Sequence, residues 1–297
     1  MTMDDLHSPL WRDIEQLQPV AHDGHRYLLV NQAAFSDRMK PIEGLAVFEK
    51  HPLLRQEPGA CCDTATPFVV RLGDGLSDKA KARALRRLCD DGCYASALSV
   101  IDSDLPLHDI ANALTARCEA QLPDNFDVLL RYFDTRILAS LMSVLTSAQL
   151  AAFFSCASQW RYADRNGRLV QAFSTESKVA DVFTPPLQFS AAQQNALIQA
   201  GEVDAVIDVL TRNKLEPLLD MPYPARHPTV QRQFVTAGQW GLSSTPDLAS
   251  YCTLALLLGE GFESQAPWDS LLAAVKRGEF NLREAIAEVE KNKSGLA

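Results

Sequence analysis

The sequence predicts an α/β (α+β) fold, with an N-terminal mixed β-sheet domain flanked by helices and a C-terminal all-helical lobe. Up to about residue 173, segments with the two-residue period of a strand alternate with segments of helical period. Beyond Pro185-Pro186 the strand patterns stop and helical patterns continue. We therefore expect an α/β domain over residues 1–175, a linker over 176–189 and a helical lobe over 190–297.

Between the N-terminus and residue 122, turn-forming residues divide the chain into the expected elements. A helix at His7–Leu17 carries Trp11, and a second helix begins at Ser77 and ends at Asp91-Gly92. A third helix is expected over Leu105–Leu122. The expected strands are Arg26–Asn31, Leu45–Phe48, Phe68–Leu72 and Cys93–Ile101, and Lys50–Thr66 is expected to be a loop.

The next segment passes from a strand pattern directly into a helical one. Apolar residues alternate over Phe126–Phe133, and Ile137–Leu145 then have helical spacing. Asp134 stands between the two patterns, where its carboxylate can accept the unpaired N–H groups of the first helical turn. Thr146 and Gln149 have the spacing of a capping box, so a second helix is expected to begin there.

A hairpin closes the predicted α/β domain. Asn166-Gly167 is a strong hairpin signal, and it lies between the expected strands Gln159–Ala163 and Leu169–Phe173. After the linker, Ser190 and Gln193 form another capping box, and the helix that they begin is expected to end at Gly201. Further helices are expected at Val203–Leu210, Thr229–Trp240, Thr245–Leu257, Pro267–Val275 and Leu282–Val289.

Composition limits the classes of function. The net charge is −9 and the pI about 5.2, which disfavours general nucleic-acid binding because that needs clustered Lys and Arg. Residues 1–5 lack a signal-peptide pattern, and no apolar run is long enough to span a membrane, so we expect a cytoplasmic protein without membrane insertion. The seven cysteines lie mostly in apolar segments and are expected to be reduced thiols.

Arg131, Asp134 and Arg136 form the main candidate constellation. They can hold an anion at a helix N-terminus, or Asp134 can cap the helix while an arginine pairs with it. We favour the structural interpretation, because no glycine-rich loop accompanies these residues.

Other clusters are weaker candidates. The His22-Asp23-Gly24-His25 segment is interpreted as a solvated turn, and the Cys61-Cys62 pair lacks the second pair that a zinc site needs. No metal or other cofactor is expected. Lys79, Arg83, Arg86 and the adjoining Arg87 make a basic helix face that is either solvated or a docking site for an acidic partner segment.

The tryptophans and the lack of known catalytic motifs also bear on fold and function. Trp160, Trp240 and Trp268 are expected to anchor cores. The sequence contains no G-x-S-x-G, Walker, H-E-x-x-H or dinucleotide-binding motif, which disfavours an enzyme.

The strand-to-helix segment resembles the type VI secretion effector-adaptor family. The resemblance is carried by Arg131-Tyr132-Phe133-Asp134-Thr135-Arg136-Ile137-Leu138, followed by Phe153-Phe154-Ser155 and Trp160. Tyr27–Val30 and Pro67–Leu72 look like the family's earlier strands. Thr135 replaces the usual proline, and Cys93–Leu98 departs from the usual tryptophan and glycine pattern. The similarity covers about residues 25–175.

The resemblance implies a chaperone-like adaptor that binds a toxic effector and couples it to the VgrG spike protein. On this hypothesis the partners are the cognate effector, through its N-terminal region, and VgrG, and the protein performs no catalysis. Lys79, Arg83 and Arg86 are then candidate partner-binding residues, whereas Arg131, Tyr132, Asp134, Arg136 and Trp160 are structural. The alternative is an enzyme that uses Arg131, Asp134 and Arg136 on a phosphorylated or carboxylated substrate.

Overall fold

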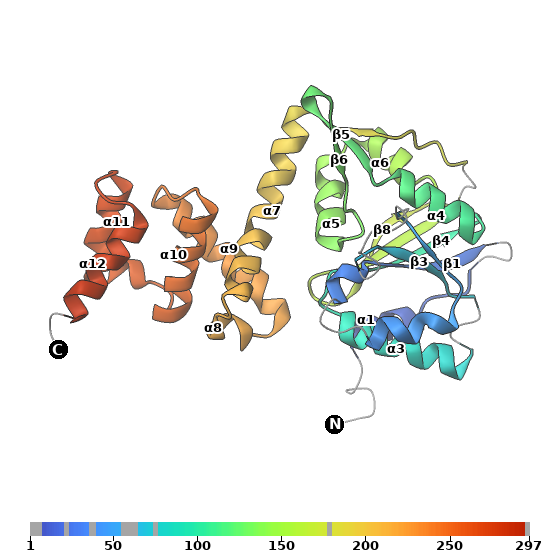
Figure 1. Cartoon of the computed structure of the whole chain (residues 1–297), viewed down its shortest axis with the longest axis horizontal. Helices are drawn as coiled ribbons and strands as arrows, with labels where there is room; N and C mark the ends of the chain where they lie inside the picture. Colours follow the sequence, from blue (N-terminus) through green and yellow to red (C-terminus); the bar gives the residue numbers. More distant parts are fainter. Residues whose placement is uncertain are drawn as a thin grey trace, which may run out of the picture. The chain divides into compact units, whose positions relative to one another are not determined.

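The computed structural model describes residues 8–20, 24–35, 40–54, 65–73, 77–176 and 180–294 (Figure 1). His22, Asp23, Cys61, Cys62 and the N-terminal residues discussed above lie outside these ranges. The chain divides into two compact units, Met1–Gln199 and Ala200–Ala297. This boundary falls within helix α7 (Ala191–Arg212), beyond the segment that the sequence predicts as a linker.

Unit 1 is built on a six-stranded sheet with the order β2-β3-β1-β4-β7-β8, in which every neighbouring pair is antiparallel. The α+β fold class predicted from the sequence is therefore confirmed. The predicted hairpin also forms, because β7 and β8 pair across the Asn166-Gly167 turn. The strands are β1 (His25–Val30), β2 (Lys50–Pro52), β3 (Phe68–Arg71), β4 (Leu98–Ser103), β7 (Gln159–Ala163) and β8 (Leu169–Ser174).

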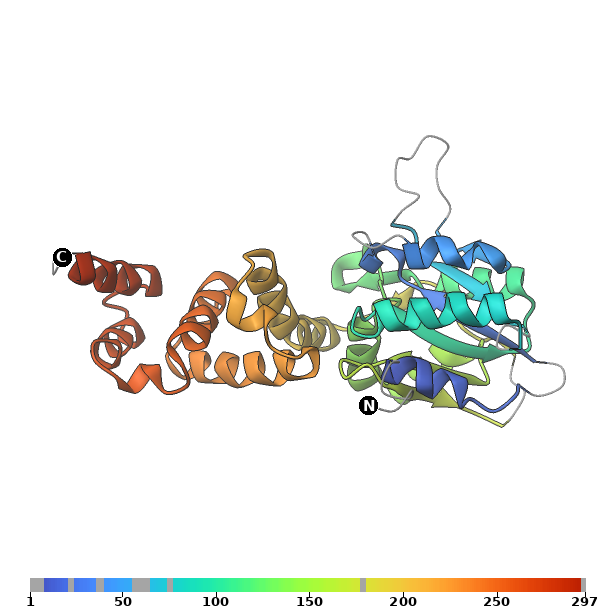
Figure 2. The same ribbon diagram turned by 90° about the horizontal axis from the view of Figure 1, so that it is seen from below.

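Helical layers cover both faces of the sheet (Figures 1 and 2). On β1, Tyr27 and Leu29 pack into one apolar cluster, whereas Leu28 and Val30 pack into the other. The alternation follows from the pleat of the strand, which directs successive side chains to opposite faces. The first layer contains α4 (Leu107–Ala116), α5 (Thr135–Val144) and α6 (Ser147–Phe154), and the second contains α1 (Pro9–Glu15), α2 (Lys40–Glu43) and α3 (Lys79–Gly92).

A smaller sheet with the order β6-β5-β9 lies beside this sandwich (Figure 1). Strands β5 (Glu119–Leu122) and β6 (Phe126–Leu129) form an antiparallel hairpin, and β9 (Leu187–Gln188) pairs in parallel with β5. The predicted linker therefore contains a strand of unit 1. Asp124 and Asn125 both have positive φ at the hairpin turn, which short polar side chains tolerate better than most.

Several predicted elements differ from the structure. The helix expected over Leu105–Leu122 ends at Ala116, because the chain turns there and β5 pairs with β6. The strand expected from Cys93 begins only at Leu98, after a turn in which Ser96 has a φ of 52°. The expected strand Leu45–Phe48 is the 3-10 helix η3 (Gly44–Val47), and β2 lies within the expected loop. The remaining 3-10 segments of unit 1 are η2 (Gln32–Phe35) and η4 (Pro123–Asn125).

The described residues of unit 2 form helices joined by turns and loops, with no strand among them. Its apolar core combines residues from α7, α9 and α10 with Leu272, Leu282 and other residues of the last two helices. The helix predicted to end at Gly201 continues to Arg212, because a glycine costs a helix only about 1 kcal/mol and the pattern resumes at Val203. The remaining helices are α8 (Glu216–Leu219), α9 (Tyr223–Gln239), α10 (Thr245–Leu258), η5 (Phe262–Ser264), α11 (Trp268–Lys276) and α12 (Leu282–Ser294).

Tryptophans and cysteines occupy the core positions that their apolar neighbours suggest. Trp160 and Trp268 are buried, while Trp240 is partly buried beneath Lys276. The cysteines that the structure describes are free and buried. Among the described residues, no helix has both the length and the apolar character needed to cross a bilayer.

Gly167 should be harder to replace than Gly73, the other described glycine of unit 1 with a positive φ. Gly167 has a φ of +69°, and an added Cβ would collide with Cys93 Sγ and come within 2.9 Å of Tyr94 Cε1. Gly73 has a φ of +50°, and no atom of the described residues beyond its chain neighbours lies within 4 Å of such a Cβ. We expect Gly167→Ala to lower the free energy of unfolding by about 2–5 kcal/mol, from strain and overpacking together.

Gly73→Ala is the matched control. It should cost about 1–2 kcal/mol, the contribution of left-handed strain alone. Urea unfolding of both full-length variants measures the difference. Equal losses of stability in the two variants would show that the clash of the added Cβ with Cys93 and Tyr94 costs no free energy of unfolding.

Candidate binding surfaces

Asp134 and Thr135 join the end of β6 to the main sheet. Asp134 is the N-cap of α5, since its side chain accepts a hydrogen bond from Arg136 N at 3.0 Å. Its carboxylate also pairs with the Arg136 guanidinium at 2.8 Å. Thr135 donates from its backbone N to Ser96 O and from its hydroxyl to Ala163 O. This turn thus connects α5 with the segment before β4 and with the end of β7.

Tyr132 lies at the centre of an aromatic cluster. It is fully buried, and its hydroxyl donates to Leu114 O at 2.7 Å. The rings of Phe133, Phe153 and Trp160 surround it at centroid distances of 5.3–6.0 Å. Burial raises the pKa of the Tyr132 hydroxyl well above its ordinary value, so it remains a neutral hydrogen-bond donor. Tyr132 and Trp160 are therefore core residues.

The sequence grouped Arg131 with Asp134 and Arg136, but the structure separates their environments. Arg131 is exposed, with its guanidinium 5.9 Å from the Phe133 ring centroid. The Asp134 carboxylate is engaged by the helix cap and by Arg136. Neither Arg131 nor Arg136 lines the cavity beside Asp181 or the cavity between β1, β3 and α3. The three residues thus form a turn and do not converge on a polar cleft.

Arg117 is a buried charge that the sequence interpretation missed. Its side chain is 0% exposed and pairs with Asp181 at 2.5 Å. It also donates to Phe153 O at 2.5 Å and to Ala113 O at 2.6 Å. The guanidinium lies 4.7 Å from the centroid of the Phe183 ring. The sequence did indicate that position 117 is buried. Arg117 follows Ile110 by seven residues and so continues the apolar face of that helix.

Asp181 is held as a carboxylate by this network. Partial burial alone would raise its pKa, but hydrogen bonds from Arg117 and Ser155 hold the pKa below its ordinary value. Ser155 Oγ lies 2.6 Å from Asp181 Oδ1 and accepts from Val182 N at 3.0 Å. The network ties α4 and α6 to the segment that leads to β9.

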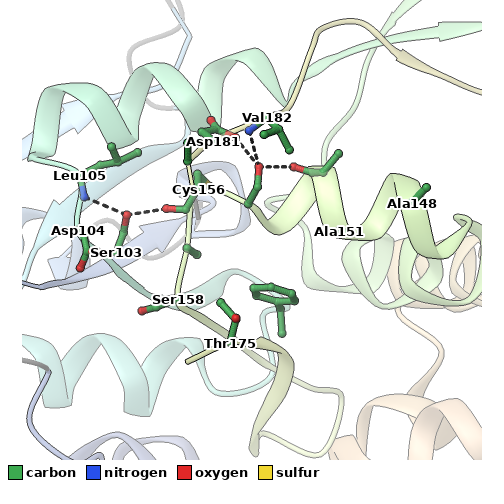
Figure 3. A pocket seen from close by; sticks show the side chains of 15 residues that line it. Ser103, Asp104, Leu105, Ala148, Ala151, Cys156, Ser158, Thr175, Asp181 and Val182 are labelled. Atoms are coloured by element: carbon green, nitrogen blue, oxygen red, sulfur yellow. Dashed lines mark hydrogen bonds between the residues drawn. The ribbon is translucent and has the colours of Figure 1, made fainter. Parts of the chain in front are cut away.

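A cavity of about 580 Å³ opens beside Asp181 (Figure 3). Its walls are mostly small side chains from the end of β4, from α6 and from the end of β8. Ser103 Oγ donates to Cys156 O and accepts from Leu105 N, as Figure 3 shows. Its lining includes Ala148, Ala151, Ala152, Ala157, Phe173 and Val182, so the surface is largely apolar.

The described lining of the cavity contains no activated nucleophile. Burial raises the pKa of the Cys156 thiol to about 11, so the thiol is protonated at neutral pH. Among the described lining residues there is no histidine, lysine or arginine, and Ser103 is engaged with backbone groups. Such a surface suits the binding of an apolar side chain better than covalent catalysis.

The basic residues of α3 lie where the sequence predicted them. Lys79 and Arg83 are exposed and Arg86 is half-buried, with the spacing of a single helix face. Within the described part of the chain these three residues have no ion-pair partner, whereas Arg87 pairs weakly with Asp91 at 3.9 Å. The helix therefore presents uncompensated positive charge on an acidic protein.

Strand β6 presents an apolar surface that the sequence did not predict. It is an edge strand of the small sheet, and Phe126 and Leu129 are 66% and 54% exposed. The period-two pattern was correct, but Phe126 and Leu129 project to opposite faces of the strand, and the pattern did not report that both would be exposed. Exposed edges with large apolar side chains are characteristic of interaction sites.

The described residues contain no group of three His, Cys, Asp or Glu side chains that could hold a metal ion. His25, part of the predicted turn, instead lies with its Nδ1 3.1 Å from Arg71 Nη2.

Comparison with known families extends this picture. Residues 26–152 match the model of a domain of unknown function, DUF4123. This domain family is commonly associated with type VI secretion effector adaptors. The match runs from β1 into α6, so it contains the Asp134 turn and the basic helix but neither β7 nor unit 2. Searches of the curated proteins and of the solved structures give no match.

The Asp134 turn yields a stability prediction. Asp134→Ala removes the cap of α5 and the partner of Arg136, so we expect the free energy of unfolding to fall by about 0.5–2 kcal/mol. Asp78→Ala, which removes the exposed cap of α3, is the control and should have a smaller effect. Urea unfolding measures both variants. Unchanged stability of Asp134→Ala together with lost partner binding would contradict a structural role.

The Arg117–Asp181 pair yields a pH-dependent prediction. Asp181→Asn leaves the guanidinium its carbonyl acceptors but removes its counter-charge, so we expect a loss of about 1.5 kcal/mol at pH 7. Because the folded-state pKa of Asp181 is lowered, its contribution is complete above the ordinary value of 3.8 and disappears as the pH falls through the folded-state pKa.

Urea unfolding at pH 7 and at about pH 3 checks this sign, and the difference between wild type and variant should shrink in acid. Glu260→Gln, which breaks the exposed Arg232–Glu260 pair, is the control and should change stability by about 0–1 kcal/mol. A difference that grows in acid would contradict the assignment.

Proposed function

We propose that this protein is a type VI secretion adaptor that binds a cognate toxic effector and couples it to a VgrG spike protein. The observation that carries the proposal is the match of residues 26–152 to a domain family associated with such adaptors. The same residues contain the strand-to-helix motif on which the sequence resemblance rests. The adaptor acts by binding and releasing a partner, without a catalytic step.

The surfaces of unit 1 support a binding function. An adaptor needs an apolar surface to cover a partner segment and charges to guide the encounter. Phe126 and Leu129 on β6 provide exposed apolar area, and the cavity beside Asp181 can accept an apolar side chain. Lys79 and Arg83 provide uncompensated charge on α3.

The geometry gives less support to an enzyme acting through the arginine–aspartate cluster. Such an enzyme needs a cleft in which Arg131 and Arg136 converge on a substrate. Arg136 instead pairs with the cap residue Asp134, and Arg131 lies on the surface. The motif therefore serves to hold α5 against the sheet.

The proposal predicts a stable complex with a protein encoded beside this one. Co-expression with a neighbouring toxin and with a neighbouring VgrG, followed by size-exclusion chromatography, should give co-elution at micromolar concentration. A lasting complex buries on the order of 1,200–2,000 Å² of surface. Generic esterase, phosphatase, nuclease and peptidase substrates should not be turned over.

Charge reversal refines this test. Arg83→Glu should lower the association rate and weaken its salt dependence more than it raises the dissociation rate, because exposed charges act mainly on encounter. Arg131→Glu makes the same change elsewhere on unit 1 and should have little effect. If neither partner co-elutes, while a substrate is turned over by wild type but not by Arg131→Ala, the enzyme alternative replaces the adaptor.

A further inference from the structure

A second cavity, of about 850 Å³, lies in unit 1 where the strands β1 and β3 meet the beginning of α3. Its apolar wall includes Ile14 and Leu17 from the α1 region and Phe48 from the end of η3. The described titratable residues of its wall are His25, Arg26, Glu49, Arg71 and Lys81. Among the described residues, the cavity therefore joins a hydrophobic surface to a predominantly cationic one.

The cations of this wall are not equally available. Arg26 is already paired and not available to a ligand, because it donates to both oxygens of the buried Asp102 at 2.7 and 2.9 Å. Arg71 is less constrained: its Nη2 lies 3.1 Å from His25 Nδ1, but its Nη1 lies 4.0 Å from the largely exposed Glu49 and the side chain is 41% exposed. Lys81 Nζ lies 5.8 Å from the Phe48 ring centroid and has no ion pair within the described residues. Arg71 and Lys81 can thus receive a carboxylate from outside.

The backbone at the beginning of α3 does not supply this site. Asp78 already accepts hydrogen bonds from Ala80 N and Lys81 N, so these N–H groups are satisfied. The beginning of α3 therefore contributes its side chains, and not these two N–H groups, to the binding of an anion in the cavity. A carboxylate between Arg71 and Lys81 would at the same time place an adjoining apolar group against Phe48.

We propose that this cavity binds a polypeptide segment of the partner in which an acidic residue adjoins an apolar one. Arg71 and Lys81 receive the acidic residue, and Ile14, Leu17 and Phe48 receive the apolar residue. The proposal rests on the proposed binding function and identifies the chemistry of the partner segment.

Charge complementarity favours a peptide over other occupants. The cavity, of about 850 Å³, has room for more than a small carboxylate. Nucleic acid is disfavoured because the apolar wall offers nothing to a phosphate backbone and the net charge is −9. Lys79, Arg83 and Arg86 lie on the solvent face of α3, nearly opposite Lys81, so they can attract an acidic segment from a distance but do not line the cavity. An acidic segment with an adjoining apolar residue matches the cavity itself.

Selection from displayed random dodecapeptides, with the full-length protein as bait, tests the proposal without a known partner. Selected peptides should be enriched in Asp or Glu beside Leu, Ile or Phe. Labelled copies should bind roughly tenfold more weakly to Arg71→Glu and to Lys81→Glu. Arg71→Gln and Lys81→Gln remove the charges without introducing repulsion, so they are the variants to use if a reversal fails to fold. Arg131→Glu is the matched control and should bind like wild type.

Each other outcome overturns the proposal. These outcomes are an absence of enrichment, selected peptides without acidic residues, or equal binding by the Arg71 and Lys81 variants. Tighter binding of octanoate than of any peptide would assign the cavity to small carboxylates. A single-stranded oligonucleotide that displaces the peptide and is itself lost in Arg71→Glu would assign it to nucleic acid.

The co-elution experiment separates this proposal from the proposed function. If a neighbouring effector co-elutes equally with wild type and with Arg71→Glu, the adaptor function stands and the cavity has been misassigned. If no partner co-elutes but acidic peptides still require Arg71 and Lys81, the cavity is a peptide site of a protein with another function.

Discussion

Burial of both faces of strands β1 and β4 is the constraint on which unit 1 depends. Because these strands have apolar side chains on either face, each face needs its own helical layer, and the polar groups gather at the ends of the strands. Asp102 lies at such a strand end, where the apolar residues of β4 give way to polar ones. It is 3% exposed and pairs with Arg26 on β1 and with Arg161 on β7, so one carboxylate compensates two arginines across three adjacent strands. The cavity that contains Arg71 and Lys81 opens at this charged end.

A second buried charge organises the opposite layer. Arg117 is enclosed by carbonyl groups from α4 and α6 and by Asp181, which comes from a segment more than sixty residues further along the chain. A buried guanidinium requires all of these acceptors, because a charge without partners in an apolar interior is strongly destabilising. The position of the segment before β9 is therefore determined by Arg117, and this segment forms one wall of the apolar cavity.

The sequence predicted best those features that depend on neighbouring residues. The Asp134 cap, the Thr146 capping box and the Asn166-Gly167 hairpin are local, and each forms as expected. The division into an α/β part and a helical part was also visible, because the change of hydrophobic period extends over many residues. Predictions from local patterns were wrong where pairing with a distant segment determines the secondary structure. A helical pattern continued through residues 119–122, but pairing with β6 makes them a strand.

The candidate surfaces were less predictable than the fold for the same reason. The basic face of α3 follows from helical spacing alone, so Lys79, Arg83 and Arg86 were identified from the sequence. Arg71 and Lys81 were not, because they belong to separate elements and meet only after β3 and α3 have packed. The exposure of Phe126 on the edge strand β6 likewise depends on which elements pack over that strand, which no periodicity reports.

An acidic protein can still recognise an acidic segment, because screening limits the range of its net charge. At physiological ionic strength the Debye length is about 8 Å, so a ligand near α3 interacts mainly with the charges within that distance. The cations there include Lys79, Lys81 and Arg83, which have no ion-pair partner in the described part of unit 1, and Arg71, whose pairing with Glu49 is loose; the cap residue Asp78 is the adjoining anion. The net charge of −9 opposes the binding of an acidic segment elsewhere on the surface, so local attraction of this kind favours an approach toward α3.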